Sequence, residues 1–193
     1  MNGGMKRTFI AIKTEPGEKI RDCIAHSKTC LKGERMKWVS TVQLHFTIDF
    51  LGDTSPAQLE MTGKMLKRIV PAYDAPTVLY RGLGVFKNMR DPKVLWIGLE
   101  IDPVLMKLKA ELDKELRRMG FWIEKRDFRP HLTLARIKQM QNREALKGLL
   151  NDYRDYFFQE SLIRKLVFYE SLLGREGPTY RVIDNYRFKY ASP

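Results

Sequence analysis

The sequence predicts an α+β protein of two like lobes, each with a mainly antiparallel sheet and helices, and a cleft lined by two related strands. Three observations predict this fold. The pattern His-apolar-Thr-apolar occurs twice, and its copies at His45 and His131 lie 131 − 45 = 86 residues apart, so each can belong to its own half of the molecule. Strand-like and helix-like segments alternate around both copies. No linker or low-complexity segment divides residues 1–193, which we expect to form a single two-lobed domain.

The first half of the chain predicts six elements from its residue periodicity. In chain order these are a strand, a helix, the first motif strand, a helix and two strands, over residues 6–13, 16–31, 43–51, 56–70, 77–82 and 94–101. The second helix has the clearest start, because Ser55 and Gln58 form a capping-box pattern with Pro56 at the first helical position.

The second half predicts five elements. They are a helix, the second motif strand, a helix and two strands, over residues 103–119, 128–136, 142–153, 163–173 and 179–190. Asp102 is the N-cap candidate of the first of these helices and Gly120 ends it. The Gly-rich turn at 174–178 predicts that the last two strands form a hairpin.

The first motif strand alternates strictly over residues 44–50. Alternation of this kind is typical of a half-buried strand, so His45, Thr47 and Asp49 are expected on the open face. An imidazole and a hydroxyl two residues apart lie about 6–7 Å from each other along such a face. The opposite, core face takes Leu44, Phe46, Ile48 and Phe50.

The second motif strand repeats the arrangement, with His131 and Thr133 on one face. Strict alternation puts Arg136 on the opposite face, from which it reaches a ligand only if the strand ends or twists near Ala135. A single histidine on a polar face is usually an ordinary solvated residue. Two copies that use two of the chain's three histidines favour a function, whereas His26 lies off the apolar stripe of its helix and is interpreted as a surface residue.

Composition limits the class of protein. Hydrophobic content of 44% and charged content of 30% are typical of a globular protein, and no apolar run approaches the roughly 18 residues of a membrane span. No signal-peptide pattern is visible, so a cytoplasmic location is the expectation. The net charge of 35 − 23 = +12 favours a polyanionic partner, nucleic acid first, although a generally basic surface would give the same balance.

Motifs for metals and nucleotides are missing from the sequence. Cys23 and Cys30 lie seven residues apart on one helix, about 10 Å, which is beyond disulfide reach. No CxxC, HExxH, acidic cluster or phosphate-binding GxxxxGK[ST] loop occurs, so we expect no metal and no cofactor.

Four segments in order resemble one family over nearly the whole chain: residues 7–12, 44–52, 126–136, and the tail 170–173 with 177–180. The paired motifs resemble the 2H (two-histidine) phosphoesterases. The set is most similar to their RNA 2′,3′-cyclic phosphodiesterase branch, the LigT-like family, historically called 2′-5′ RNA ligases.

The resemblance implies metal-independent opening of RNA 2′,3′-cyclic phosphate ends to 2′-phosphates, with weak ATP-independent 2′-5′ ligation as the reverse reaction. It implies His45 as the acid and His131 as the base, with Arg136 as a substrate contact. The residues alone leave the two histidine roles open, because an imidazole pKa of about 6.5 allows both protonation states near neutrality. Thr47 and Thr133 can hold the non-bridging oxygens.

Further expectations complete the sequence-based interpretation. Phe9 could stack on a base, or it could be a core residue. Asp49 is expected to flank the phosphate site. The partner is RNA with cyclic phosphate ends, and the protein is expected to be a monomer. Two alternatives are a phosphodiesterase for a small cyclic phosphate, such as a cyclic nucleotide or an ADP-ribose cyclic phosphate, and a non-catalytic RNA-binding module.

Overall fold

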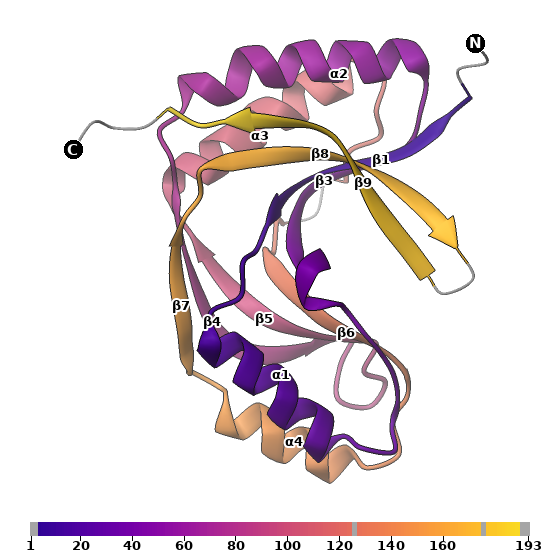
Figure 1. The fold of residues 1–193 in the computed structure, drawn as a ribbon, viewed down its shortest axis with the longest axis vertical. Helices are drawn as coiled ribbons and strands as arrows, with labels where there is room; N and C mark the ends of the chain where they lie inside the picture. Colours follow the sequence, from indigo (N-terminus) through magenta and orange to yellow (C-terminus); the bar gives the residue numbers. More distant parts are fainter. Residues whose placement is uncertain (1–3, 125–126, 175–176, 190–193) are drawn as a thin grey trace.

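The computed structural model describes residues 4–124, 127–174 and 177–189. Its strands form two antiparallel sheets (Figure 1). The first sheet has the order β3-β1-β8-β9, with β3 (His45–Thr54), β1 (Lys6–Lys13), β8 (Lys165–Gly174) and β9 (Gly177–Arg187). The second has the order β2-β6-β5-β4-β7, with β2 (Arg35–Trp38), β6 (His131–Gln139), β5 (Val94–Ile101), β4 (Thr77–Phe86) and β7 (Phe157–Leu162).

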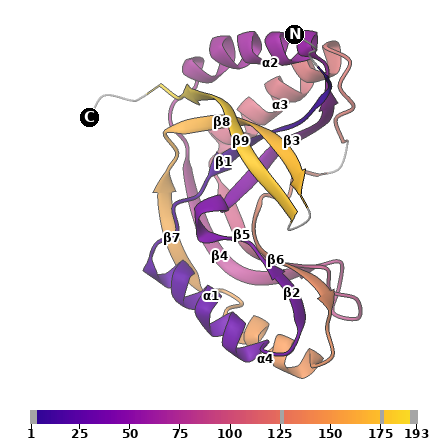
Figure 2. The ribbon, with the colours of Figure 1, turned by 45° about the vertical axis from the view of Figure 1, so that its right-hand side comes forward.

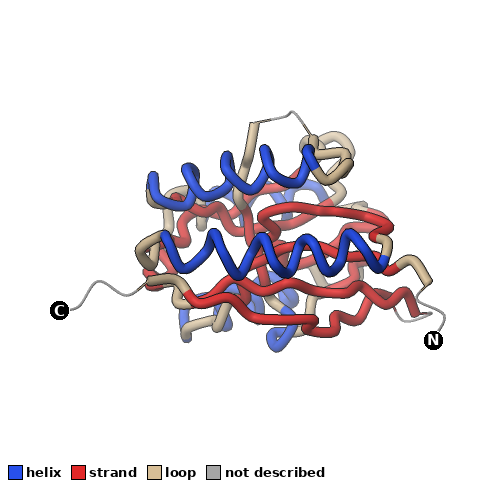
Figure 3. The backbone as a smooth tube through the Cα atoms, turned by 90° about the horizontal axis from the view of Figure 1, so that it is seen from above, coloured by secondary structure: helices blue, strands red, loops and turns tan. Residues whose placement is uncertain are grey.

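Two pairs of helices cover the outer faces of these sheets (Figures 1 and 2). The pair on the first sheet is α2 (Pro56–Ile69) and α3 (Pro103–Arg118), and the pair on the second is α1 (Glu18–Cys30) and α4 (Arg143–Asp152). The view from above shows α2 and α3 side by side over the strands (Figure 3). The short 3₁₀ turns are η1 (Thr41–Gln43) and η2 (Val70–Ala72). The α+β fold of two antiparallel lobes is confirmed, and each lobe contains one motif strand.

The lobes do not correspond to the first and second halves of the chain. Helix α1 follows β1 of the first sheet but packs on α4 and β7 of the second lobe. Helix α3 lies between β5 and β6 in the sequence, yet it packs on α2 in the first lobe. The chain therefore crosses repeatedly between the lobes.

The predicted bounds and caps of helices and strands were accurate where the local sequence pattern was clear. The strands β1 and β5 have the predicted bounds. In α2 the Ser55 Oγ accepts from the Gln58 backbone N–H at 3.2 Å, and Gln58 Oε1 accepts from the Ser55 N–H at 3.1 Å, so the capping box is confirmed. Asp102 Oδ1 caps α3 by accepting from the Val104 N–H at 2.7 Å.

The prediction missed β2 and β7, and both lie at the edges of the second sheet. An edge strand contacts only one neighbour and buries few side chains, so its sequence carries little hydrophobic pattern. The closing hairpin of β8 and β9 is confirmed. Residues 175 and 176 of its predicted turn and residue 190 at its predicted end lie outside the described residues, and so does residue 126 of the segment 126–136.

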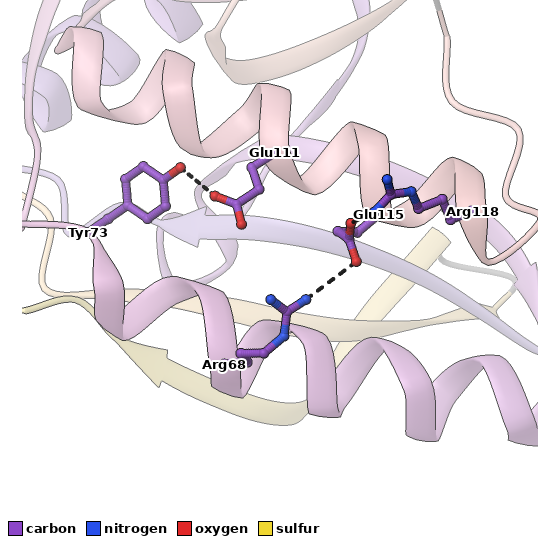
Figure 4. A network of polar contacts seen from close by, with 5 residues as sticks. All are labelled: Arg68, Tyr73, Glu111, Glu115 and Arg118. Atoms are coloured by element: carbon purple, nitrogen blue, oxygen red, sulfur yellow. Dashed lines mark hydrogen bonds and ion pairs between the residues drawn. The ribbon is translucent and has the colours of Figure 1, made fainter.

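Polar contacts join α3 to α2 and to the turn that follows α2 (Figure 4). Tyr73 donates to Glu111 at 2.6 Å, and this hydrogen bond raises the pKa of the Tyr73 hydroxyl to about 12. Glu115 accepts from Arg68 at 3.4 Å and from Arg118 at 2.5 Å. Beneath these contacts α3 buries one apolar face, through Leu105, Leu108, Leu112 and Leu116. No helix in the described part of the chain is long and apolar enough to cross a membrane.

Candidate active site

Both motif strands carry a β-bulge at the fourth residue of the motif. In the pairing of β3 with β1, Ile48 is the extra residue, because Ile10 lies opposite Asp49 while Ala11 lies opposite Thr47. In the pairing of β6 with β5, Leu134 is the extra residue in the same way. A bulge shifts the alternation of side chains by one residue, so every face assignment after it changes.

The bulge in β3 overturns two expectations. Asp49 was expected on the open motif face, but it is 5% exposed, and its Oδ1 accepts from Lys109 Nζ of α3 at 2.9 Å. It therefore does not flank the phosphate site. Phe50 was expected in the core, but it is 50% exposed.

The bulge in β6 overturns a third expectation, the one for Arg136. Strict alternation put Arg136 on the face opposite His131, yet its positive charge acts on His45 and on Tyr180, which both belong to the other lobe. Arg136 is exposed and lies on the open face, because Leu134 takes up the extra position. Arg136 and Phe50 thus occupy equivalent places, two residues past each bulge.

His45 is half-buried among aromatic rings of the first lobe. Its Nδ1 donates to the Gln43 carbonyl oxygen at 2.7 Å, which leaves Nε2 as the nitrogen available for proton transfer. The ring centroid lies 4.9 Å from that of Tyr180 and 5.2 Å from that of Phe9. Burial lowers the pKa of His45 below 6.5; the bond to Gln43 opposes this, and the charge of Arg136 lowers the pKa further.

His131 repeats this arrangement in the second lobe. Its Nδ1 donates to the Arg129 carbonyl oxygen at 2.9 Å, again two residues earlier in the chain. The centroid of its ring lies 4.8 Å from that of Phe86, edge to face, and 6.5 Å from that of Trp96. Both histidines therefore have the same tautomer, fixed by the same backbone geometry.

The structure brings the motif residues of the two lobes to one place. The strands β3 and β6 contact each other, and the half-buried hydroxyl residues Thr47 and Thr133 share the face of their histidine. The positive charge of Arg136 in β6 contributes to lowering the pKa of His45 in β3, after burial. The site thus offers two imidazoles, two hydroxyls and one guanidinium from both lobes.

Phe9 does not fit the expectation that it stacks on a base. It is 1% exposed and packs with Ala11, Val167 and Tyr169, so the core alternative applies. Its role is to back the His45 ring. The exposed aromatic neighbour is Phe50, whose ring stacks on that of Phe9 at 6.1 Å and lies under Arg7 at 5.1 Å.

Sequence reasoning missed the aromatic residues around the histidines: Tyr169, Tyr180, Phe86 and Trp96. None of them belongs to a motif, and only the strand pairing brings them to the site. A signal existed for Trp96, because it alternates with buried residues in β5.

His26 and the two cysteines have the surroundings that the sequence predicts. His26 is exposed, and its Nδ1 bonds the Tyr153 hydroxyl at 3.1 Å. Cys23 is buried, Cys30 is exposed and both are free thiols; burial raises the pKa of Cys23 to about 11. Within the described ranges, no group of three His, Cys, Asp or Glu side chains is placed to hold a metal ion.

Comparison with known proteins identifies this arrangement. The sequence matches the family model described as LigT like Phosphoesterase over residues 10–96 and 99–180. The chain belongs to the LigT-like phosphoesterases. Both motif strands lie within the matched residues, so the protein is an enzyme of the phosphoesterase class.

Relatives and solved structures cover nearly the full length of this LigT-like chain. An RNA 2′,3′-cyclic phosphodiesterase of Methanothermobacter thermautotrophicus is 31% identical and covers 94% of this chain and 98% of its own. The protein of the same name from Aeropyrum pernix is 34% identical over 90% and 94%. TT0787 of Thermus thermophilus superposes with a TM-score of 0.74 at 25% identity, covering 94% and 97%. E. coli LigT complexed with 3′-AMP, at 22% identity over 95% and 98%, shares the fold with a TM-score of 0.73.

Gly84 is expected to be essential for the packing beside His131. A Cβ at this position would lie 2.3 Å from two atoms of the Trp96 ring, which itself contacts Phe86. Gly84→Ala is therefore expected to destabilise the protein by about 1–3 kcal/mol, as overpacking does, and to lower kcat/KM by displacing Trp96. Urea unfolding and steady-state kinetics measure both effects.

Gly148→Ala is the matched control for this change. Gly148 lies inside α4 with nothing within 4 Å of a Cβ, so alanine should stabilise the helix by about 0.5–1 kcal/mol. Equal stability of the Gly84→Ala and wild-type proteins would contradict the proposed packing.

Proposed function

We propose that this enzyme opens 2′,3′-cyclic phosphate ends of RNA to 2′-phosphates by a two-histidine mechanism. The observation that carries the proposal is the pair of equivalent His and Thr residues, one pair from each lobe, with both imidazoles held through Nδ1. The names of the relatives support the substrate, since several are RNA 2′,3′-cyclic phosphodiesterases.

The chemistry requires an acid and a base on opposite sides of phosphorus. In the proposed reaction His131 Nε2 removes a proton from water, and the water oxygen forms a bond to phosphorus. The bond from phosphorus to the 3′ oxygen breaks, and His45 Nε2 gives that oxygen its proton. Each proton transfer contributes about 10²–10⁴-fold. In this proposal Thr47, Thr133 and Arg136 stabilise the charge on the non-bridging oxygens.

Substrate binding favours the proposed role of His45 as the acid. In the free enzyme, burial and Arg136 keep the pKa of His45 low. A cyclic phosphate diester carries one negative charge, which pairs with Arg136 and favours the protonated imidazole. The substrate therefore supplies part of the charge that makes His45 an acid.

The positive net charge of the chain and an exposed aromatic ring near the site both favour RNA as the substrate. The net charge of +12 attracts a polyanion, and Phe50 takes the base-stacking role first considered for Phe9, since its ring is open. Weak 2′-5′ ligation is the same reaction reversed, with an RNA 5′-hydroxyl in place of water. The monomeric state and the cytoplasmic location stay predictions of the sequence.

The test is an RNA oligonucleotide with a 2′,3′-cyclic phosphate end, incubated with the enzyme in EDTA. We expect a 2′-phosphate product, identified by its resistance to a 3′-specific phosphatase. His26→Ala should retain full activity, because His26 lies on α1 away from both motif strands, and His45→Ala should not. A 3′-phosphate product would contradict the assigned direction. Bound but unopened RNA would favour a binding module, and turnover of small cyclic phosphates alone would favour the other alternative.

A further inference from the structure

A cavity of about 560 Å³ lies in the second lobe, between α4 and the loop that joins β4 to β5. Figure 1 shows this loop beside α4 at the lower right. None of the motif residues lines the cavity. Its lining comes from the end of β4, the loop, α4 and the turn after it: Leu83, Met89, Arg90, Arg143, Glu144, Lys147, Leu150, Asn151 and Arg154. We call this the α4 groove.

The α4 groove combines apolar and cationic side chains. Leu83, Met89 and Leu150 supply apolar surface. The cations are Arg90, Arg143, Lys147 and Arg154, against one acid, Glu144. A site of this kind matches a ligand with both a flat apolar part and a negative charge. A nucleotide has these two properties in its base and its phosphate.

The four cations of the α4 groove outnumber its one lining acid, Glu144, and within the described residues none of them forms an ion pair. Within the described ranges, the side chains of Arg90, Arg143 and Lys147 form no ion pair, and Arg154 donates only to Asn151 Oδ1 at 3.1 Å. Like charges held close together repel, which costs stability. An anionic partner would remove this repulsion, so the groove is better suited to a bound state than to an empty one.

The chain connects the α4 groove directly to the candidate active site. Strand β4 ends at Phe86, whose ring contacts His131, and the loop that follows carries Met89 and Arg90 into the groove. Leu83 lies opposite Ile97 and Gly84 lies opposite Trp96, so Leu83 lines the groove from the face of the sheet opposite to Trp96 and Thr133. An RNA whose cyclic end lies at His131 must therefore pass around the end of β4, along this loop, to reach the groove.

We propose that the α4 groove binds a nucleotide of the RNA substrate upstream of its cyclic phosphate end. The proposal rests on the proposed function and specifies which part of the protein reads the body of the RNA. It predicts a substrate preference that depends on length. Short cyclic phosphates use only the motif residues, whereas longer RNAs also use the groove.

The test compares Arg90→Gln/Lys147→Gln with wild type on two substrates in EDTA. One is a cyclic-phosphate dinucleotide, and the other is an RNA of about twelve nucleotides, within the range that single-strand sites cover. We expect KM for the long RNA to rise about tenfold. The slope of log KM against log salt concentration should fall by about 1.4, because two phosphate contacts are lost. Turnover of the dinucleotide should not change.

The control is Lys67→Gln/Lys114→Gln, which removes the same charge from exposed positions on α2 and α3 of the other lobe. Equal effects of the two double variants would overturn the proposal, because net charge alone would then explain RNA binding. Unchanged KM for the long RNA would overturn it as well. Failure of the proposed function is a different result, namely no opening of either substrate by the wild-type enzyme.

Discussion

Loss of either motif histidine is expected to lower kcat for opening a 2′,3′-cyclic phosphate by about 10²–10⁴-fold. In the proposed mechanism, His131→Ala removes the base that activates water, and His45→Ala removes the acid that protonates the leaving oxygen. Both alanines also leave space in the aromatic surroundings of Phe86 or Tyr180. Asparagine variants keep more of that volume, and single-turnover kinetics of both kinds of variant separate proton transfer from packing.

In the proposed mechanism the two histidines act as a unit, and this gives the prediction a second test. Because neither proton transfer is productive without the other, His45→Ala/His131→Ala is expected to lose little more activity than either single variant. Independent, multiplicative losses would contradict a shared acid–base reaction. A single variant that kept a tenth of the wild-type rate would contradict it too.

The pair also predicts how activity depends on pH. The profile of kcat/KM should be bell-shaped, with one limb for each imidazole in the free enzyme. The limb of His45 should lie below pH 6.5, because burial and then Arg136 lower its pKa. Arg136→Gln removes a charge that disfavours the imidazolium, so this limb should move to higher pH. Arg21→Gln, an equal charge change at an exposed position of α1, should leave it in place.

Alternation along the motif strands was predictable from the sequence only as far as the bulges. The positions of His45, Thr47, His131 and Thr133 on one face follow from a two-residue period. A bulge, by contrast, is defined by the neighbouring strand, and nothing within residues 44–50 marks Ile48 as the unpaired residue. For this reason Asp49, Phe50 and Arg136 were each placed on the wrong face.

Predictions that depend on a single segment were correct. Few features that depend on contacts between distant segments could be predicted. The capping box at Ser55 depends on four consecutive residues, and the structure reproduces it. The aromatic surroundings of His45 come from three separate strands, β1, β8 and β9, whose pairing the sequence does not specify. The interlaced lobes were not predictable for the same reason, since the assignment of α1 and α3 depends on packing between distant segments.

Lys109→Met is expected to have the largest effect on stability, because Lys109 ties α3 to the first motif strand. Its Nζ donates to Asp49 Oδ1 at 2.9 Å and to Asp113, and it lies 5.6 Å from the ring of Phe128. Asp49 Oδ2 is buried with no hydrogen-bond partner among the described residues. Removing the cation leaves a buried carboxylate without its partner, a change that costs about 3–5 kcal/mol in comparable buried pairs.

The pH dependence of this loss has a definite sign. Burial raises the pKa of Asp49 to about 7, although the charge of Lys109 lowers it. Since the folded pKa lies above that of the unfolded chain, the stabilisation that proton binding gives is complete below pH 3.8 and is lost as pH rises through 7. Without Lys109 the folded pKa rises further, because a cause that lowers it is gone. The variant should therefore be more strongly destabilised at pH 8 than at pH 5, where Asp49 holds its proton.

Urea unfolding of Lys109→Met at pH 5 and pH 8 measures this difference, and Lys64→Met is the matched control. Lys64 pairs with Glu60 one helical turn away, but both side chains are exposed, so its removal should hardly change stability at either pH. Equal losses for the two variants would mean that the Asp49 pair behaves as a surface contact. A loss of equal size at pH 5 and pH 8 would mean that Asp49 is ionised at both pH values in the fold. Either result would contradict the structural role that we assign to the ion pair. In that role the pair holds β3 against α3, so that the bulge at Ile48 keeps His45 and Thr47 on the open face.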